Sequence, residues 1–339
     1  MKPIAVVILN WNGAAMLRRF LPSVLRSAGE LATVYVADNG STDDSRHLVE
    51  TEFPEALWLP LDRNYGFAGG YNRALRQIEE PYYMLLNSDV ETPADWLRPL
   101  HSYMEQHAEV AACQPKLLCE CDHTRFEYAG GSGGFMDWLG YPFCRGRVFA
   151  DVETDQGQYN EVTTVFWATG AALLIRRDDF WQVGGLDDRF FAHMEEIDLC
   201  WRLRSRGRGI VCIPDSEVYH VGGGTLPQGN PRKTFLNFRN NLLMLYKNLP
   251  QAELRSVFAW RMLLDFVAAA QFGLTGHWGE CRAVFRAWRA FRKLRPEVRA
   301  DRIENLKLTR CVFIRERVSF SLLWRYYVKR QHTFTQLMK

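Results

Sequence analysis

The first hundred residues alternate between short apolar runs and segments with helical spacing. Ile4–Leu9 is a continuous apolar run, which is typical of a strand buried on both faces. Met16–Ser27 then repeats its apolar residues at the spacing of one helix face. The same patterns predict strands at Thr33–Ala37, Leu57–Pro60 and Tyr82–Leu86, and helices from Ser41 and over Gly69–Glu79. Strands and helices that alternate in this way predict an α/β fold with a mostly parallel sheet covered by helices.

The pattern changes twice further along the chain. Gly130–Asn160 is rich in glycine and aromatic residues and has little periodicity, which predicts loops that line a cleft. Strands are predicted again at Ala171–Arg176 and Ile210–Ile213, with a helix at Glu196–Arg206 between them. After Pro231 the chain shows long Arg-rich helical patterns and no clear strand. We therefore expect an α/β domain at residues 1–230 and a mainly helical region at residues 231–339.

Composition excludes several classes of protein. The chain has 339 residues, of which 47% are apolar and 24% charged, so it can bury a large core and is not predicted to be disordered. Eight dispersed cysteines predict reduced thiols, with a metal cluster at Cys119, Cys121 and His123 as the alternative. No cleavage site follows the short N-terminal apolar run, so we expect a strand there and not a secretion signal. Residues 257–274 are apolar but contain two charges, which predicts a core helix instead of a membrane span.

Charge is distributed unevenly along the chain. Residues 231–339 contain 22 Lys and Arg against 7 Asp and Glu, whereas residues 1–230 contain 20 against 32. A basic region attached to an acidic body predicts an anionic surface as its partner. Aromatic residues interleave the basic stretch 282–330, as expected for a helix lying on anionic lipid headgroups. A nucleic-acid-binding protein is an alternative, but it would leave the acidic groups of the N-terminal part unexplained.

Polar side chains follow three of the predicted strands. These strand ends are Asn10-Trp11-Asn12, Asp38-Asn39-Gly40-Ser41 and Asn87-Ser88-Asp89. Because ligands of parallel sheets bind outside the carboxyl ends of the strands, the three ends together predict a nucleotide site. Asp38 is placed to accept a hydrogen bond from a base, and Trp11 to stack nearby. Each end taken alone is equally typical of a turn or a helix cap.

Two further segments suit a diphosphate and a metal ion. The glycine-rich segment Asn64–Asn72 runs into a helix, so its backbone N–H groups are predicted to approach phosphate oxygens. Asp89, at a strand end beside that segment, suits a hard divalent cation bridging protein and diphosphate. The alternative for Asp89 is an N-cap of a helix at Thr92–Met104.

Acidic residues and a histidine complete the candidate chemistry. Glu195, Glu196 and Asp198 lie within four positions, next to aromatic residues that favour a general base with a raised pKa. Acids at a helix N-terminus also stabilise the helix, so a structural role is the alternative for some of them. His220 follows an apolar strand and precedes a triple-glycine loop at residues 222–224.

These motifs together resemble one enzyme family. VVILNWNG, VADNGSTDDS, NYGFAGGYN, LLNSDV, ATGAALLIRR, GGLDDRFFAHMEEIDLCWRLRSRG and VYHVGGGT occur in this order across residues 3–230. The set is similar to the inverting family 2 glycosyltransferases, which have the GT-A nucleotide-diphosphosugar transferase fold, and within them to bacterial rhamnosyltransferase-type enzymes. The resemblance implies transfer of a sugar with inversion from a nucleotide-diphosphate donor, dTDP-rhamnose or a UDP-sugar, in cell-surface glycan synthesis. The implied acceptor is a hydroxyl of a lipid-linked molecule or polysaccharide.

The resemblance also implies roles for residues. Glu196 would be the catalytic base with Glu195 as runner-up, although the family commonly has Glu-Asp at this pair. Asp89 and His220 would bind a divalent metal, Mg²⁺ or Mn²⁺, and Asn87 replaces the first Asp of the family's Asp-x-Asp motif. The residues expected to contact the nucleotide sugar, from motif and strand-end position together, are Asn10, Trp11, Asn12, Asp38, Asn64, Gly66, Asn72 and Asn87.

The expected location follows from acceptor and charge. We expect a cytoplasmic enzyme held peripherally on the inner face of the cell membrane through residues 231–339, with no nucleic-acid partner. A nucleotide-sugar-binding protein without turnover is the remaining alternative, since a fold does not establish activity.

Overall fold

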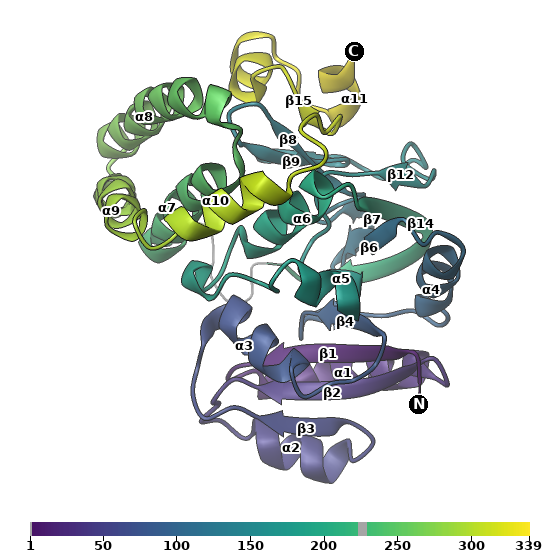
Figure 1. Cartoon of the computed structure of the whole chain (residues 1–339). Coiled ribbons are helices and arrows are strands. Elements are labelled where there is room, and N and C mark those ends of the chain that lie inside the picture. The colour runs from purple at the N-terminus through teal and green to yellow at the C-terminus, as the bar shows by residue number, and fades with distance from the viewer. Residues whose placement is uncertain (1, 223–228) are drawn as a thin grey trace.

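The computed structural model describes residues 2–222 and 229–339 of the chain. Its centre is a ten-stranded mixed sheet among these residues (Figure 1). The strand order is β12 (Thr163–Thr164), β14 (Gly209–His220), β6 (Val110–Cys119), β13 (Ala172–Arg176), β4 (Tyr82–Leu86), β1 (Ile4–Asn10), β2 (Ala32–Asp38) and β3 (Leu57–Pro60). In addition, β5 (Val90–Glu91) pairs with β14, and β7 (Asp122–Phe126) pairs with β6.

The N-terminal part forms the predicted parallel sheet between helices. Strands β4, β1, β2 and β3 are parallel neighbours, and the register places Asn10 opposite Asp38 at their carboxyl ends. Alternate residues of β1 enter two different cores, Ala5 and Val7 in one and Ile4 and Val6 in the other, because side chains of a strand alternate between faces. Helices α1 (Ala14–Ala28) and α2 (Ser45–Glu52) contribute to the second core, and α3 (Gly66–Leu75) to the first.

β13 interrupts the parallel order. It pairs antiparallel with both β4 and β6, whereas β6 and β14 are parallel to each other. β6 is ten residues long and nearly all buried, and the sequence analysis did not predict it. α4 (Leu97–Gln106) precedes it and begins later than predicted. α5 (Arg177–Gln182), the 3-10 helix η1 (Asp188–Phe190) and α6 (Glu195–Ser205) lead from β13 to β14.

A second, five-stranded sheet occupies the segment that was predicted to be loops. Its order is β11 (Asp151–Val152), β10 (Arg147–Val148), β9 (Pro142–Cys144), β8 (Gly134–Asp137) and β15 (Arg317–Val318). Phe135 and Phe143 are buried in the first core instead of lining a cleft. The prediction was wrong because strands of two to four residues carry almost no periodicity. In addition, β8 pairs with a strand near the C-terminus.

The C-terminal helices share a core with the α/β part. They are α7 (Pro231–Asn248), α8 (Gln251–Leu274), α9 (Trp278–Leu294), α10 (Arg299–Leu308), the π-helical turn η2 (Trp324–Val328) and α11 (Phe334–Met338). α7 is buried along most of its second half and packs against α6. A single cluster of buried side chains extends from Ala5 to Leu337. The described side chains therefore pack without a domain boundary between residues 230 and 231, where the sequence predicted one.

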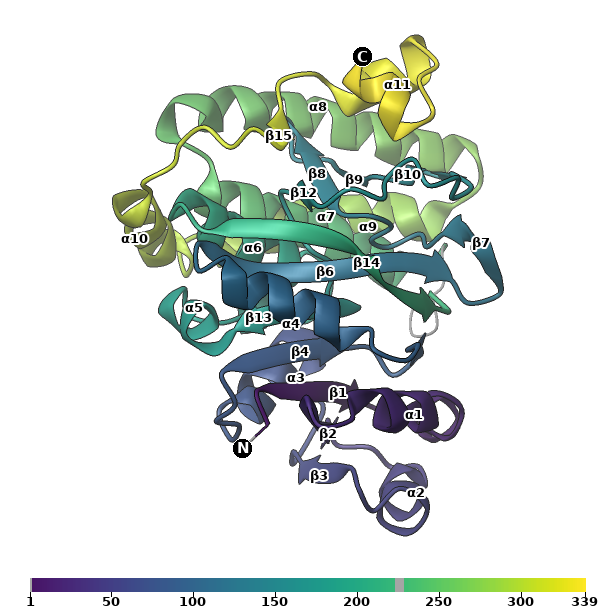
Figure 2. The ribbon, with the colours of Figure 1, turned by 90° about the vertical axis from the view of Figure 1, so that its right-hand side faces the viewer.

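α8 is not the core helix that was expected. By length and apolar composition alone it could cross a membrane, and only 22% of its most apolar 18-residue stretch is buried. Arg261 and Asp265, the two charged residues after Ser256, are buried and pair with each other at 3.1 Å, whereas Glu253 and Arg255 of the first turns are not buried. From Ser256 onward the helix thus turns its charges inward and most of its apolar side chains outward. α8 lies at the end of the molecule opposite α2 and β3 in both views (Figures 1 and 2).

Candidate active site

The carboxyl ends of β1 and β2 bring together four of the residues predicted to contact a nucleotide. Asn10 Nδ2 donates to Asp38 Oδ1 at 3.3 Å and to Ser41 Oγ at 3.1 Å. The Ser41 N–H donates to the Asp38 carboxylate, and the Asn12 N–H donates to Ser41 Oγ. Asn10 Oδ1 is buried without a hydrogen-bond partner, whereas the Trp11 ring is 50% exposed. This edge thus combines a fixed carboxylate with an accessible aromatic ring.

The glycine-rich segment does not offer its N–H groups to a ligand. The Phe67 and Ala68 N–H groups donate to the carbonyl oxygen of Phe191, at 2.6 and 3.3 Å. The Gly66 N–H donates to Asn64 Oδ1 at 2.8 Å. Gly66 has a φ of +73°, and a Cβ there would lie 2.5 Å from the Phe191 carbonyl oxygen. The glycine is required for this close packing against Phe191, so the phosphate role predicted for these N–H groups does not fit the structure.

Asn72 is also a structural residue in this arrangement. Its Nδ2 donates to the Leu186 carbonyl at 2.7 Å and to Asp188 Oδ1 at 2.6 Å. Its Oδ1 accepts from the Leu186 N–H at 3.0 Å. Both ends of this buried amide are therefore occupied by the chain. The predicted contact between Asn72 and the donor is not supported.

Asp89, Asn87 and His220 meet where the chain leaves β4 and β5 pairs with the end of β14. His220 Nε2 lies 3.1 Å from Asp89 Oδ1 and 3.3 Å from Asn87 Nδ2. On the other side of the ring, Nδ1 lies 3.3 Å from Glu127 Oε1. Burial alone would lower the pKa of His220, but the Asp89 and Glu127 carboxylates outweigh it and raise this pKa to about 10. Burial opposes ionisation of Asp89, yet His220 keeps the Asp89 pKa below its usual value.

These residues fit a divalent cation that takes most of its ligands from phosphate oxygens of the enzyme's substrate. Glu127 faces Nδ1, so it can hold the ring in the orientation that turns Nε2 toward Asp89, as carboxylates do for metal-binding histidines. Within residues 2–222 and 229–339, no three His, Cys, Asp or Glu side chains surround one metal position. Mg²⁺ and related cations are commonly held by one or two protein ligands plus phosphate oxygens. The alternative role of Asp89 as a helix N-cap is excluded, because α4 begins only at Leu97. The glycines at 223–224 lie outside the described residues.

The acid pair begins α6 after a segment of unusual backbone conformation. Phe191, His193 and Met194 have positive φ angles of 65°, 70° and 72°, which cost non-glycine residues about 1–3 kcal/mol each. Such conformations concentrate at functional sites, where surrounding contacts enforce them. Glu195 is only 4% exposed, whereas Glu196 is partly exposed. Of the pair, Glu196 is therefore the less buried residue, although its Oε2 atom is itself buried and has no hydrogen-bond partner among the described residues.

Burial also raises the pKa values of both acids of the pair. Burial raises the pKa of Glu196 to about 7, although the N–H groups of Glu196 and Ile197 act in the opposite direction. Burial and the neighbouring Glu196 charge raise the pKa of Glu195 well above its usual value. Asp198 is fully buried and accepts from Lys247 at 2.8 Å and Arg202 at 2.9 Å, so it is a structural acid.

A short turn before β13 connects the acid pair to the Asp89 cluster. The Asn87 N–H donates to the Ala171 carbonyl at 3.0 Å. A Cβ at the neighbouring Gly170 would lie 3.7 Å from Glu196 Cβ and 3.0 Å from the Phe67 ring. The Asp89 cluster and Glu196 thus both border the turn formed by Gly170 and Ala171.

Three residues of this region escaped the sequence analysis. Glu127 reaches His220 only because β7 folds back on β6. Asn39 was noted only within a strand end, yet its side chain joins β2 to the glycine-rich segment through Tyr65 N, Asn64 Oδ1 and the Gly66 carbonyl. Asn240 lies in the region assigned to membrane binding and contacts the segment before the acid pair. Glu127 and Asn240 stand in none of the motifs, and Asn39 lies in the motif VADNGSTDDS without having been given a role.

The chain is similar to known glycosyltransferases in sequence and in fold. The profile of Glycosyl transferase family 2 matches residues 5–184, which include Asp38 and Asp89 and end before Glu195. The chain is 28% identical over 233 residues to an N-acetylglucosaminyl-diphospho-decaprenol L-rhamnosyltransferase of Mycobacterium tuberculosis, covering 64% of this chain and 75% of the relative.

Two solved structures share the fold at low sequence identity. One is GalNAc-T7 with UDP, GalNAc and Mn²⁺, with a TM-score of 0.57, 16% identity and 73% of this chain covered; this chain spans 48% of its length. The other is the mannosyltransferase PcManGT of Pyrobaculum calidifontis with GDP-Man and Mn²⁺, with a TM-score of 0.53, 14% identity and coverage of 90% and 87%. These similarities confirm the predicted GT-A fold. Since the family profile covers more than half of the chain, this protein belongs to glycosyl transferase family 2.

Proposed function

We propose that this glycosyltransferase moves a sugar from a nucleotide diphosphate to a hydroxyl group of a lipid-linked or polysaccharide acceptor. The observation that carries the proposal is the arrangement around one region of the sheet. The carboxylate of Asp38 lies at the β1–β2 edge, the Asp89–His220 pair lies at the end of β4, and Glu196 borders the same turn as that pair. The mycobacterial relative is named for an N-acetylglucosaminyl-diphospho-decaprenol acceptor and a rhamnosyl product, which supports dTDP-rhamnose and a lipid-linked acceptor as the first candidates.

The donor is proposed to lie along these strand ends. Asp38, held by Asn10 and Ser41, would accept from the base, and Trp11 would cover it. Asp89 and His220 would hold a divalent cation against the diphosphate, with Glu127 orienting the histidine. Bound there, Mg²⁺ or Mn²⁺ would neutralise charge that develops on the departing diphosphate. Mn²⁺ is the better-supported ion, since it accompanies both solved structures.

Glu196 is proposed to be the general base of a single displacement. It would take the proton of the acceptor hydroxyl while that oxygen bonds to the anomeric carbon. The bond from the anomeric carbon to the diphosphate oxygen breaks in the same step, so the configuration inverts and nucleoside diphosphate leaves. A carboxylate whose pKa is near 7 suits this task, because it is both available as a base and basic enough at neutral pH. Glu195 is more deeply buried, and burial together with the Glu196 charge raises its pKa well above its usual value, which favours its protonated form.

Thermal unfolding with a panel of donors tests the proposed substrate class. We expect dTDP-rhamnose, UDP-GlcNAc or GDP-mannose to raise the Tm when Mn²⁺ is present and to have less effect after chelation. Ligand at 100 times its Kd stabilises a native protein by about 2.7 kcal/mol, which is readily measured. Free sugars serve as controls. The proposed donor site is wrong if no member of the panel shifts the Tm at millimolar concentration, or if the shifts are the same with and without Mn²⁺.

The proposal includes attachment to an anionic membrane surface through α8 and α9. Between Ser256 and Leu274 no exposed residue of α8 is charged, and Leu263 and Val267 are 55% and 57% exposed. Arg261 and Asp265 face the protein, where Arg261 donates to the Leu139 carbonyl and Trp288 donates to Asp265. No other part of the described chain covers this apolar face of α8 after Ser256. Such a face is typical of a helix that lies in the headgroup region.

α9 supplies the matching charge. Its exposed face carries several cations beside the exposed rings of Trp278 and Phe285, and these cations would meet anionic headgroups next to the apolar α8 stripe. These residues are Arg282, Arg286, Arg289, Arg292 and Lys293. Basic residues near anionic lipid contribute roughly 1 kcal/mol each. A lipid-linked acceptor would then be presented at the surface to which the enzyme is bound.

Vesicle co-sedimentation tests this attachment. We expect binding to increase with phosphatidylglycerol content, to weaken with salt and to fall at least tenfold in Leu263→Asp. Leu57→Asp is the matched control, because Leu57 is comparably exposed at the opposite end of the molecule. Truncation at Pro231 is not a suitable test, since it would remove buried residues of α7. Equal binding by the two variants would refute the proposed attachment through α8 and α9. Binding that does not depend on lipid charge or salt would refute it too.

A further inference from the structure

The backbone segment before the acid pair is held by hydrogen bonds to its carbonyl groups. Asn240 Nδ2, on α7, donates to three of them. They belong to Phe190, Ala192 and His193, at 2.9, 2.8 and 2.7 Å. The adjacent Arg239 donates to the carbonyls of Arg189 and Phe190, and the Phe191 carbonyl accepts from α3. All five consecutive carbonyls of residues 189–193 are therefore bound, on one side by α7 and on the other by α3.

These contacts hold a conformation that the segment would not adopt alone. Phe191, His193 and Met194 all have positive φ angles, a region that L-amino acids rarely populate. Such a backbone persists only where neighbouring groups over-determine it. Asn240 is fully buried, and within residues 2–222 and 229–339 its amide is the one side-chain group that bonds to carbonyls on both sides of Phe191. Its hydrogen bonds thus help to hold the backbone in these φ angles.

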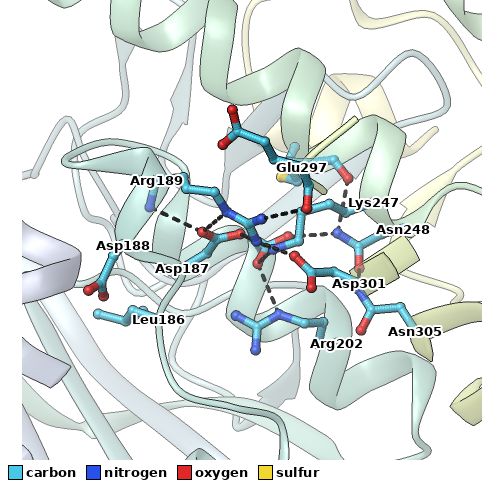
Figure 3. Close-up of polar contacts among 12 residues, drawn as sticks. Leu186, Asp187, Asp188, Arg189, Arg202, Lys247, Asn248, Glu297, Asp301 and Asn305 are labelled. Carbon is cyan, nitrogen blue, oxygen red and sulfur yellow. Dashed lines mark hydrogen bonds and ion pairs between the residues drawn. The ribbon is translucent and has the colours of Figure 1, made fainter. Parts of the chain in front are cut away.

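An ionic network fastens both ends of the same segment to the C-terminal helices. Lys247 Nζ, two turns after Asn240 on α7, donates to Asp187 Oδ2 at 2.6 Å and to Asp198 Oδ2 at 2.8 Å. Asp187 precedes the segment and Asp198 follows the acid pair. Arg189 in turn bonds to Asp187 and to Asp301 of α10 (Figure 3). The position of the acid pair is therefore coupled to helices that lie outside the family-matched residues 5–184.

We propose that Asn240 is a positioning residue for the Glu196 carboxylate, acting through the backbone of residues 190–193. The inference rests on the proposed role of Glu196 as the base. Without the Asn240 amide, the Ala192 and His193 carbonyls lose their side-chain donor and the Phe190 carbonyl retains only Arg239 and the Ala192 N–H, so the segment relaxes toward ordinary φ angles. Glu195 and Glu196 begin the helix that follows, so their carboxylates move with it. Asp38 and Asp89 make their hydrogen bonds to Asn10, Ser41 and His220 and not to the carbonyls of this segment, so we expect donor binding to be affected less than the base.

Asn240→Ala is the primary test, with Asn241→Ala as its matched control. Asn241 is the next residue of α7, is equally buried, and donates to the Gly140 carbonyl at 2.7 Å, away from the acid pair. Using the donor that gives the largest thermal shift in the panel, we expect kcat of Asn240→Ala to fall about 100-fold, the loss typical of a misplaced catalytic group. Its donor KM should be unchanged. Asn241→Ala should lower the Tm but leave kcat within about twofold.

Two readouts separate positioning from general damage. Hydrogen exchange of the amides in residues 190–196 should speed up in Asn240→Ala and not in Asn241→Ala. The double variant Glu196→Gln, Asn240→Ala should be no slower than Glu196→Gln alone, because Asn240 acts through that carboxylate. Asn240→Ser keeps one donor and should lose less activity; it replaces the alanine variant if that variant does not fold.

The outcomes distinguish this inference from the proposed function. If Glu196→Gln turns over normally, the base assignment fails whatever Asn240 does. If Glu196→Gln is crippled but Asn240→Ala matches Asn241→Ala in kcat and in exchange, the positioning role alone is wrong. Additive losses in the double variant would also overturn it, since Asn240 would then act on something other than Glu196.

Discussion

Replacing Glu196 with glutamine is expected to lower kcat by roughly 100- to 10,000-fold, the usual contribution of a general base. Glutamine has nearly the same shape but accepts no proton, so folding and donor affinity should be preserved. In the wild type, kcat/KM should rise with pH and level off above an apparent pKa of about 7, because the base works only when it is deprotonated. That acidic limb should be lost in the variant. Steady-state kinetics from pH 5 to 9, together with donor titration, measure both effects.

Glu195→Gln is the matched comparison for this prediction. Glu195 is adjacent and almost fully covered, and burial together with the Glu196 charge raises its pKa well above its usual value, which favours its protonated form. Glutamine resembles a protonated glutamate, so this variant should retain most of its turnover. If Glu195→Gln is the crippled variant and Glu196→Gln is active, the base is one residue earlier than proposed. If both remain active, neither carboxylate is the base.

Changing Asp89 to asparagine is expected to abolish detectable transfer and to remove the Mn²⁺ dependence of donor binding. Asp89 is the only carboxylate within the described part of the chain that contacts His220 Nε2, the ring atom facing the proposed cation. Its loss would leave Glu127 as the one carboxylate of the described residues that contacts His220. The fold should survive, because Asp89 caps no helix. Donor binding with and without Mn²⁺, followed by calorimetry or thermal shift, measures the effect separately from turnover.

The control for Asp89 is an aspartate of the same loop region that has no part in the cluster. Asp95 is exposed and pairs only with Arg98, so Asp95→Asn should leave metal dependence and kcat unchanged. Glu127→Gln should lie between the two, with a loss of about 10- to 100-fold, as is usual for residues that orient metal ligands. Normal turnover of Asp89→Asn in saturating Mn²⁺ or Mg²⁺ would exclude the metal role.

The sequence predicted the strand-end groups well because they depend on local patterns. The apolar runs before Asn10, Asp38 and Asn87 place all three at carboxyl ends, and parallel pairing aligns those ends without further information. The contact between Asp89 and His220 spans 131 positions, and periodicity alone does not predict it. It could be expected only from the resemblance to a family in which both positions recur.

Other features were beyond a reading of local pattern. Glycines that allow Phe191 to pack closely look the same in sequence as glycines that admit a phosphate, so the role of Gly66 was misjudged. In α8, Arg261 and Asp265 would ordinarily mark the face toward water, yet they pair inside the protein. Asn240 carries no motif, and its role depends on three carbonyl groups about fifty residues away.

The most direct test of the central claim is to follow one reaction by NMR. The enzyme, Mn²⁺, the donor selected by the thermal panel and a prenyl-diphospho-N-acetylglucosamine acceptor in anionic vesicles would be observed over time. The account predicts a new glycosidic bond whose anomeric configuration is opposite to that of the donor, with one nucleoside diphosphate released per bond formed. Retention of configuration would contradict the single displacement. A donor that binds, with none of the acceptors tested ever glycosylated, would contradict the proposed transfer.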